Sequence, residues 1–242
     1  MGSLDKRLWD LACAKASGRM VLEVVRGVRY TAALLDNGRV GLAYSFSDMV
    51  MPEEEASAIL SSLPVDAAEA LGLSSSRCPG DRAVALAVAN GLLPVEGELS
   101  GAIPRVEPGA EVLMVGRMEP LENKLVALDA KVFFADHHRC GGLDDKEALD
   151  MASRCDLVVL SASAIVNGTW ERFVELARDC WVAGPSAPLC WDVYKETSVS
   201  AVLGRSVKSP QALMRIVSRG CGTRFFDPFT DRVLLCGGPL CD

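Results

Sequence analysis

The first half of the chain shows the hydrophobic pattern of one helix, several strands and then further helices. An apolar stripe at helical spacing, with Ser3 at its cap and Gly18 at its end, predicts the first helix. Strand-like runs follow at residues 20–25, 28–35 and 39–46. Asn37-Gly38 lies between the last two runs and predicts a hairpin, because this dipeptide supplies the positive φ angles of such turns. Helical stretches at residues 52–61, 64–71 and 79–93 complete an α+β pattern.

After residue 110 the pattern changes to short apolar runs that alternate with helical stretches. This alternation predicts a doubly wound parallel sheet, with a strand order that begins 2-1-3-4. The predicted strands are at residues 111–115, 131–135, 157–160, 181–183 and 198–202. The predicted helices are at residues 120–128, 144–154, 169–178, 188–195 and 209–218. A further strand-like run at 232–236 has no predicted place in this sheet.

A stretch rich in proline and glycine separates the two patterns. Residues 94–109 show neither helical nor strand periodicity, which is typical of a linker. We therefore predict two domains, at residues 1–100 and 108–242, and an overall α/β fold class.

Composition and charge narrow the classes of function. Half of the residues are hydrophobic, enough to bury a substantial core. The formal net charge of −7 argues against a nucleic-acid partner, since phosphate backbones are bound by basic surfaces. No apolar run approaches the roughly 18 residues of a membrane span, and the start of the chain lacks the apolar core of a secretory signal. We expect a cytoplasmic protein without a membrane span, and homo-oligomerisation is left open.

The nine cysteines form no CxxC pair, which argues against a zinc ribbon. Most are expected to be small buried hydrophobic residues in a reducing compartment. Cys236 and Cys241 are the pair for which a disulfide is considered. The reason is the scarcity of Asn and Gln, a feature of thermophilic proteins, some of which carry intracellular disulfides.

The turn after the first strand of the predicted parallel sheet has features of an anion site. Gly116 permits close backbone approach, and Arg117 can pair with a carboxylate or phosphate. Glu119 and Pro120 open the next helix, whose free N–H groups favour an anion. The turn lacks the GxGxxG fingerprint of dinucleotide-binding folds, so a plain strand-to-helix turn is the alternative. Replacing Arg117 by alanine is predicted to weaken the binding of an anionic ligand.

Two more loops of small polar residues follow the third and fourth strands of this sheet. Their candidate ligand-binding residues are Asn167, Gly168, Thr169, Gly184, Pro185 and Ser186. Either loop alone could simply cap a helix. Parallel strands bring their carboxyl ends to one edge of a sheet, so both loops and the Gly116 turn are predicted to line one crevice that holds a small-molecule ligand.

The segment DHHRC carries the remaining candidates. Asp136 lies 20 residues after Gly116, a spacing typical of an acidic residue on the ribose of a nucleotide, although it could equally cap a loop. His137, His138 and Cys140 are suitable ligands for a transition metal ion. Adjacent histidines on an extended chain point in opposite directions, so at most two or three of these donors could meet one ion, and a surface loop is the alternative.

Taken together, these motifs resemble the family named for "putative heavy-metal chelation". The resemblance rests on residues 28–45 (VRYTAALLDNGRVGLAYS), 85–90, Gly116 with Pro120, 161–169 and 184–188, and it extends to about Asp227. It implies a first domain like the N-terminal domain of enolase, a Rossmann-like second domain with helices on both faces of its sheet, and a site in the cleft between them. The DHHRC segment and the cysteine-bearing tail are not part of the family pattern, so the resemblance does not make them metal ligands.

Three hypotheses follow. The first is binding, with or without processing, of a small anionic metabolite or metal chelate in the cleft, where Arg117 pairs with the anion and Asn167, Thr169 and Ser186 orient it. The second is an enzyme with a nucleoside-bearing cofactor whose ribose is held by Asp136. The third is direct binding of a transition metal ion by His137, His138 and Cys140. Neither the ligand nor a reaction follows from the sequence.

Overall fold

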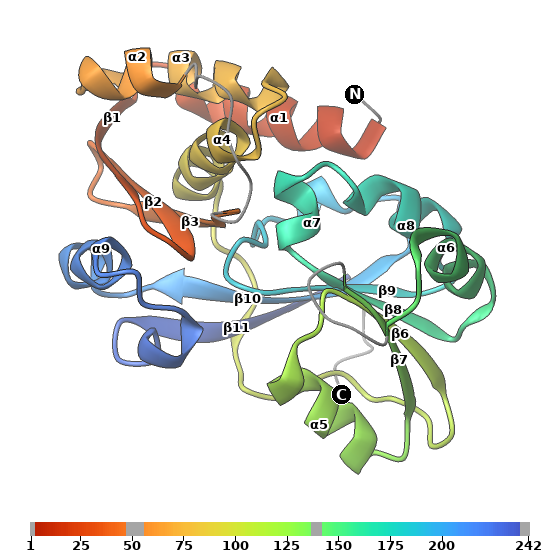
Figure 1. The fold of residues 1–242 in the computed structure, drawn as a ribbon. Helices are drawn as coiled ribbons and strands as arrows, with labels where there is room; N and C mark the ends of the chain where they lie inside the picture. Colours follow the sequence, from red (N-terminus) through yellow and green to blue (C-terminus); the bar gives the residue numbers. More distant parts are fainter. Residues whose placement is uncertain (1–2, 47–55, 137–141, 238–242) are drawn as a thin grey trace.

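The computed structural model describes residues 3–46, 56–136 and 142–237, and these form two sheets flanked by helices (Figure 1). The first half contains a four-stranded antiparallel sheet, and the second half a mainly parallel sheet of seven strands. The predicted α/β fold class, with an α+β part followed by a parallel sheet, is confirmed.

The first sheet has the strand order β3-β2-β1-β4. Its strands are β1 (Met20–Arg26), β2 (Tyr30–Leu35), β3 (Val40–Tyr44) and β4 (Val65–Asp66), and its helices are α1 (Ser3–Ala16), α2 (Ala56–Ser61), α3 (Ala67–Leu71) and α4 (Pro79–Leu92). The predicted hairpin joins β2 to β3, and Gly38 in its turn has a φ of +79°. The buried α4 packs on β2 and β3, and its many alanines allow the helix to approach the sheet closely.

The second sheet has the strand order β5-β11-β10-β9-β8-β6-β7. Its strands are β5 (Glu98–Leu99), β6 (Glu111–Val115), β7 (Lys131–Ala135), β8 (Leu157–Ser161), β9 (Cys180–Ala183), β10 (Val199–Val207) and β11 (Thr230–Cys236). Five neighbouring strands, β7, β6, β8, β9 and β10, are parallel. The first four of them have the predicted order 2-1-3-4, and β10 follows as the fifth. The run at 232–236, which had no predicted place, is β11, an antiparallel partner of β10.

Helices cover both faces of the second sheet (Figure 1). α5 (Glu119–Ala127) lies on one face, where its Leu125 packs with Val112 and Met114 of β6. α6 (Asp145–Arg154), α7 (Ser163–Val166) and α8 (Trp170–Leu176) lie on the other face with Leu113. Successive residues of a strand point to opposite faces, so β6, buried on both sides, is almost entirely apolar.

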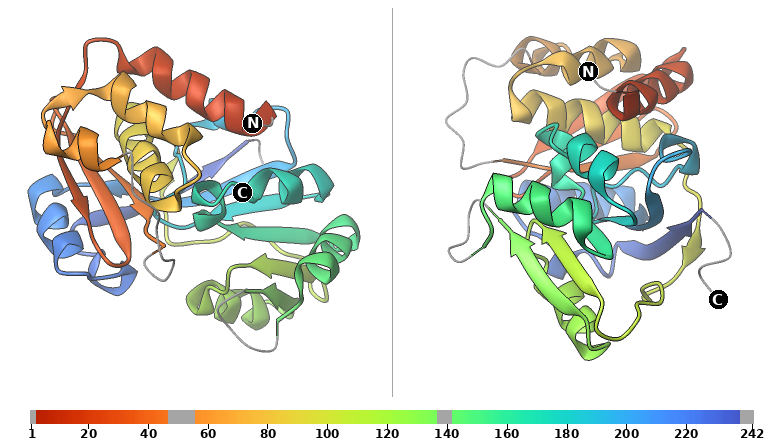
Figure 2. Two further views of the ribbon diagram at one scale, coloured as in Figure 1. Left: turned by 45° about the horizontal axis from the view of Figure 1, so that its top comes forward. Right: turned by 90° about the vertical axis from the view of Figure 1, so that its right-hand side faces the viewer.

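The last helix returns to the first half of the molecule. α9 (Pro210–Ser218) places Leu213, Met214 and Val217 against Tyr30 and Leu42 on the face of the first sheet that α4 leaves free. The left view of Figure 2 shows α9, in blue, beside these strands. The first sheet therefore lies between a helix from its own half and a helix from the second half.

One predicted helix is wrong. The stretch 188–195 contains only a single 3-10 turn, η2 (Trp191–Val193). Leu189 and Cys190 are buried in non-helical backbone before it, and the Tyr194 hydroxyl donates a hydrogen bond of 2.9 Å to the Pro188 carbonyl. Tertiary packing of these apolar residues has overridden the helical periodicity.

The main core continues from one half into the other. It joins side chains of α1, α3 and α4 to those of α6, α7 and α8 without interruption. Because the halves share a core, the residues at their junction are held in fixed positions.

Among the described residues, no helix is both long and apolar enough to cross a membrane.

Candidate functional site

A cleft of about 930 Å³ lies at the carboxyl ends of β6, β8, β9 and β10. Tyr30, Tyr44 and Phe46 of the first half form one wall of it, and Arg205 and Arg232 of β10 and β11 form another. The cleft brings together ten of the predicted ligand-binding residues: Gly116, Arg117, Glu119, Pro120, Asp136, Asn167, Thr169, Gly184, Pro185 and Ser186. Ligands of open α/β sheets bind at this edge of the sheet.

Two glycine turns form the floor of the cleft. Gly116 has a φ of +79°, and a Cβ atom there would lie 2.8 Å from the Cβ of Ser161. Gly184, with a φ of +125°, follows β9. Both positions require glycine because other residues rarely adopt such φ angles, and the Gly116 turn also has no room for a side chain. The hydroxyls of Ser161 and Ser163 lie 2.9 Å apart beside these turns.

The loop before α8 is stabilised by hydrogen bonds between its own residues. The Asn167 Oδ1 atom accepts hydrogen bonds from the backbone N–H of Thr169 (3.1 Å) and from its hydroxyl (2.7 Å). Gly168 is not among the residues that line the cleft. It has a φ of +73°, and a Cβ atom there would lie 3.0 Å from the Arg82 Nη1 atom. Gly168 therefore serves the packing of the loop against Arg82.

Arg117, in the turn that follows β6, and Asp136, after β7, already have partners. The Arg117 guanidinium forms two hydrogen bonds with Glu122, of 2.8 and 3.1 Å, and lies 4.8 Å from the centre of the Phe134 ring. The hydrogen bond to Glu122 raises the pKa of Arg117. Asp136 accepts a hydrogen bond of 3.0 Å from the Arg117 backbone N–H. The Asp136 carboxylate therefore caps this turn, which is the role that the sequence offered as the alternative to a ribose contact.

Ser186 joins the two halves of the molecule. Its hydroxyl accepts a hydrogen bond of 2.7 Å from the Tyr44 backbone N–H, and only 2% of the residue is exposed. The side-chain amide of Asn90 on α4 donates to the carbonyl oxygens of both Leu42 and Ser186. These bonds fix β3 against the loop after β9, so a role of Ser186 in orienting a ligand stays a prediction.

Sequence reasoning missed the basic residues on the far walls of the cleft. Arg172 lies on α8 and pairs with Asp145 at 3.6 Å, while Arg205 and Arg232 lie on the last two strands. Arg29 and Arg224 are exposed, and among the described residues neither forms an ion pair. No motif marks these positions, because residues as far apart in the sequence as Arg29 and Arg224 meet only in the folded chain.

The cleft is positively charged although the chain is acidic. Its described lining residues include seven cationic side chains, Arg29, Arg117, Lys124, Arg172, Arg205, Arg224 and Arg232, and four carboxylates, Glu119, Asp136, Asp145 and Asp227. The formal net charge of the whole chain is −7. A concave surface with an excess of positive charge attracts anions from solution.

The predicted metal ligands are not placed by the part of the chain that the structure describes. His137, His138 and Cys140 lie outside the described residues. Within the described ranges, no three His, Cys, Asp or Glu side chains are grouped so as to hold a metal ion. Burial raises the pKa of the Cys155, Cys180 and Cys190 thiols, which keeps them protonated and disfavours metal binding.

Cys236 takes part in a disulfide, and Cys241, its predicted partner, lies outside the described residues.

The paired state of Arg117 changes the expected result of its replacement. We expect Arg117→Ala to weaken citrate binding less than about threefold, because Glu122 already neutralises the guanidinium and its exposed charge is screened by water. Glu122→Gln should strengthen citrate binding, since it removes the competing carboxylate. Calorimetric titration of both variants measures these effects, and weaker binding in Glu122→Gln would contradict the expectation.

Two family models match the chain, and both are described as "Putative heavy-metal chelation": one, DUF364, matches residues 102–236 and the other, DUF4213, residues 9–93. The fold is similar to that of a DUF364 protein of unknown function from Pyrococcus horikoshii, with 18% identity over 96% of this chain and 99% of that one, and a TM-score of 0.81. A DUF364 protein from Desulfitobacterium hafniense, also of unknown function, has 20% identity over 96% and 98% of the two chains, and a TM-score of 0.73. No curated protein matches this chain. At these identities the solved structures establish the fold alone.

Proposed function

We propose that this chain, which belongs to the DUF364 family described as "Putative heavy-metal chelation", binds a small anionic metal chelate or the anionic chelator itself in the cleft between its halves. The observation that carries the proposal is the excess of cationic over acidic side chains in the cleft of an acidic chain. A metal ion enters as cargo that its chelator already surrounds.

The side chains of the cleft favour a chelate over a bare metal ion. A free divalent or trivalent cation is repelled by a surface in which guanidinium groups outnumber carboxylates. Carboxylate or phosphate groups of a chelator are well matched to guanidinium groups, which bind them with two parallel hydrogen bonds. This reconciles the metal in the family description with a described lining that has no cluster of metal ligands.

The other two hypotheses receive less support. A ribose contact of Asp136 competes with the hydrogen bond that its carboxylate accepts from the Arg117 backbone, and the turn lacks the glycine fingerprint. Direct metal binding by His137, His138 and Cys140 rests on residues outside the described ranges. We therefore keep only the chelate proposal.

Charge reversal at the open edge of the cleft tests the proposal. Arg29 and Arg224 are exposed, so the double variant Arg29→Glu/Arg224→Glu should fold while turning the excess positive charge of the cleft into an excess negative charge. We expect the affinity for citrate and for ferric citrate to fall about tenfold or more, which corresponds to 1.4 kcal/mol or more of binding free energy. Isothermal titration calorimetry at low ionic strength measures both affinities.

A matched control separates the charge of the cleft from the charge of the whole protein. Lys15→Glu/Arg105→Glu changes the net charge by the same amount, and both residues are exposed and outside the cleft lining. This control should bind both probes as the natural chain does. Equal affinities in the two double variants, or no binding of either probe by the natural chain, would contradict the proposal.

A further inference from the structure

Arg205 and Arg232 form a like-charge pair on neighbouring strands. β10 and β11 are antiparallel, and their register places Arg205 directly opposite Arg232. Like charges in this position destabilise a sheet. Both residues line the cleft, so an unfavourable arrangement for folding lies where a ligand would bind.

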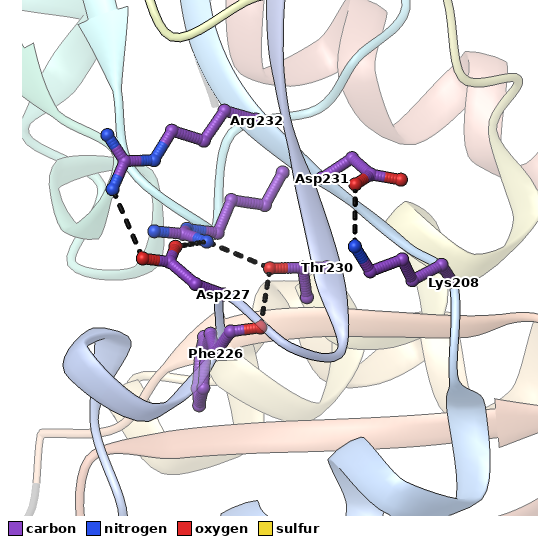
Figure 3. Close-up of polar contacts among 7 residues, drawn as sticks. Lys208, Phe226, Asp227, Thr230, Asp231 and Arg232 are labelled. Atoms are coloured by element: carbon purple, nitrogen blue, oxygen red, sulfur yellow. Dashed lines mark hydrogen bonds and ion pairs between the residues drawn. The ribbon is translucent and has the colours of Figure 1, made fainter.

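A single carboxylate bridges the two guanidinium groups. Asp227 accepts a hydrogen bond of 2.7 Å from Arg205 Nη1 through one oxygen and one of 3.3 Å from Arg232 Nη2 through the other. Figure 3 shows its carboxylate facing Arg232. The hydrogen bond from Arg205 holds the pKa of Asp227 below its usual range, so the carboxylate is charged near neutral pH. The Asp227 side chain is 55% exposed and comes from a loop rather than from either strand.

A buried hydroxyl group holds the Arg205 guanidinium in place. Its side chain is only 12% exposed, and it donates a second hydrogen bond, of 2.9 Å, to the hydroxyl of the buried Thr230. That hydroxyl in turn donates to the carbonyl oxygen of Phe226, which packs against Tyr30. The cation is therefore fixed by buried partners that do not depend on Asp227, which is the preorganisation that anion recognition requires.

An ion pair of one cation and one carboxylate lies on the opposite face of the sheet from these arginines. Lys208 and Asp231 pair one to one at 2.8 Å, away from the bridged arginines (Figure 3). Neither residue lines the cleft. On the cleft side two cations share one carboxylate, which leaves a positive charge for a ligand to neutralise.

Resting on the proposed function, we infer that Arg205 and Arg232 form a subsite for a carboxylate or phosphate group of the ligand. Asp227 occupies this position in the structure and leaves it when the ligand anion enters. The exposed loop position of Asp227 permits this exchange, while Arg205 stays fixed on Thr230. The subsite lies on the β10–β11 wall of the cleft, and further cationic side chains, among them the exposed Arg29 and Arg224, line the cleft beyond it. The ligand class is thus an anion with two or more acidic groups.

Three single variants test the subsite with citrate and pyrophosphate as probes. Arg232→Gln removes a guanidinium whose side chain is 53% exposed, so it should fold, and it should weaken the better probe about tenfold. Asp227→Asn removes the competing carboxylate and should strengthen binding several-fold while lowering the melting temperature of the empty protein. Lys208→Gln breaks the ion pair on the opposite face and should leave both affinities unchanged. Calorimetry at low ionic strength measures the affinities, and circular dichroism the melting.

Strengthened binding in Asp227→Asn is the outcome that a purely structural role of Asp227 would not give. Unchanged or weaker binding in that variant, or natural affinity in Arg232→Gln, overturns the inference. Asp227→Ser provides a second variant should Asp227→Asn fail to fold. A preference for citrate identifies a carboxylate ligand, and a preference for pyrophosphate a phosphate. If Arg232→Gln binds normally while Arg29→Glu/Arg224→Glu binds weakly, only the subsite fails and the proposed function stands.

Discussion

Replacing Asp5 by alanine is expected to lower the free energy of unfolding by about 3 kcal/mol, because it leaves a largely buried arginine without its counterion. Asp5, on α1, accepts a hydrogen bond of 2.6 Å from the indole N–H of the fully buried Trp170. It also lies 3.5 Å from a guanidinium nitrogen of Arg82, which donates to the Ile165 carbonyl. These contacts join the first half of the molecule to α7 and to the start of α8. Urea denaturation followed by circular dichroism measures the loss.

Two further variants define the cause of this loss. Asp10→Ala breaks the exposed Lys6–Asp10 pair on the same helix and should cost less than about 0.5 kcal/mol. Asp5→Asn keeps an acceptor for the Trp170 N–H while removing the charge, so its stability should lie between those of the natural chain and Asp5→Ala. A loss in Asp5→Ala no greater than that in Asp10→Ala would show that the buried network contributes nothing.

Gly41→Ala is expected to destabilise the protein by about 3 kcal/mol or more, since its new methyl group would overpack a rigid interface. A Cβ atom at this position of β3 would lie 2.0 Å from the Ala87 carbonyl oxygen and 2.4 Å from the Gly91 backbone nitrogen. Both atoms belong to the backbone of α4, so no side-chain rotation relieves the contact. The variant must separate α4 from the sheet, and thermal or urea unfolding measures the result.

Gly72→Ala is the matched control for this substitution. Gly72 has a φ of −55°, and no heavy atom lies within 4 Å of the position of its Cβ atom. Alanine should therefore be neutral there or stabilise by about 0.5 kcal/mol through a lower entropy of the unfolded chain. Equal effects at the two glycines would contradict the close packing of β3 on α4.

The order of elements could be predicted from the sequence because it depends on local patterns. Hydrophobic periodicity distinguished the α+β first half from the alternating strands and helices after residue 110, and Asn37-Gly38 marked the hairpin between β2 and β3. The order of the parallel strands followed from the doubly wound pattern, in which the strand order reverses after the first strand. The exception, residues 188–195, shows that periodicity alone does not distinguish a helix from buried non-helical backbone.

The floor of the candidate site was also predictable, because consecutive parallel strands deliver their following turns to one edge of the sheet. Gly116, Thr169 and Gly184 meet there for this reason. Which side chains face a ligand was not predictable in the same way. Glu122 reaches Arg117 from within α5, and Arg82 occupies the space beside Gly168 from another half of the chain.

The sequence by itself determined the two halves, the strand order of the parallel sheet and the glycine turns that follow it. Only the tertiary structure decided where α9 and β11 lie, and with them the arginine wall formed by Arg205 and Arg232. The physical reason is the separation in sequence of the residues that interact. Secondary structure and crossovers follow from neighbouring residues, whereas the charge of a cleft depends on side chains brought together across nearly 200 residues, from Arg29 to Arg224, by burial of apolar surface.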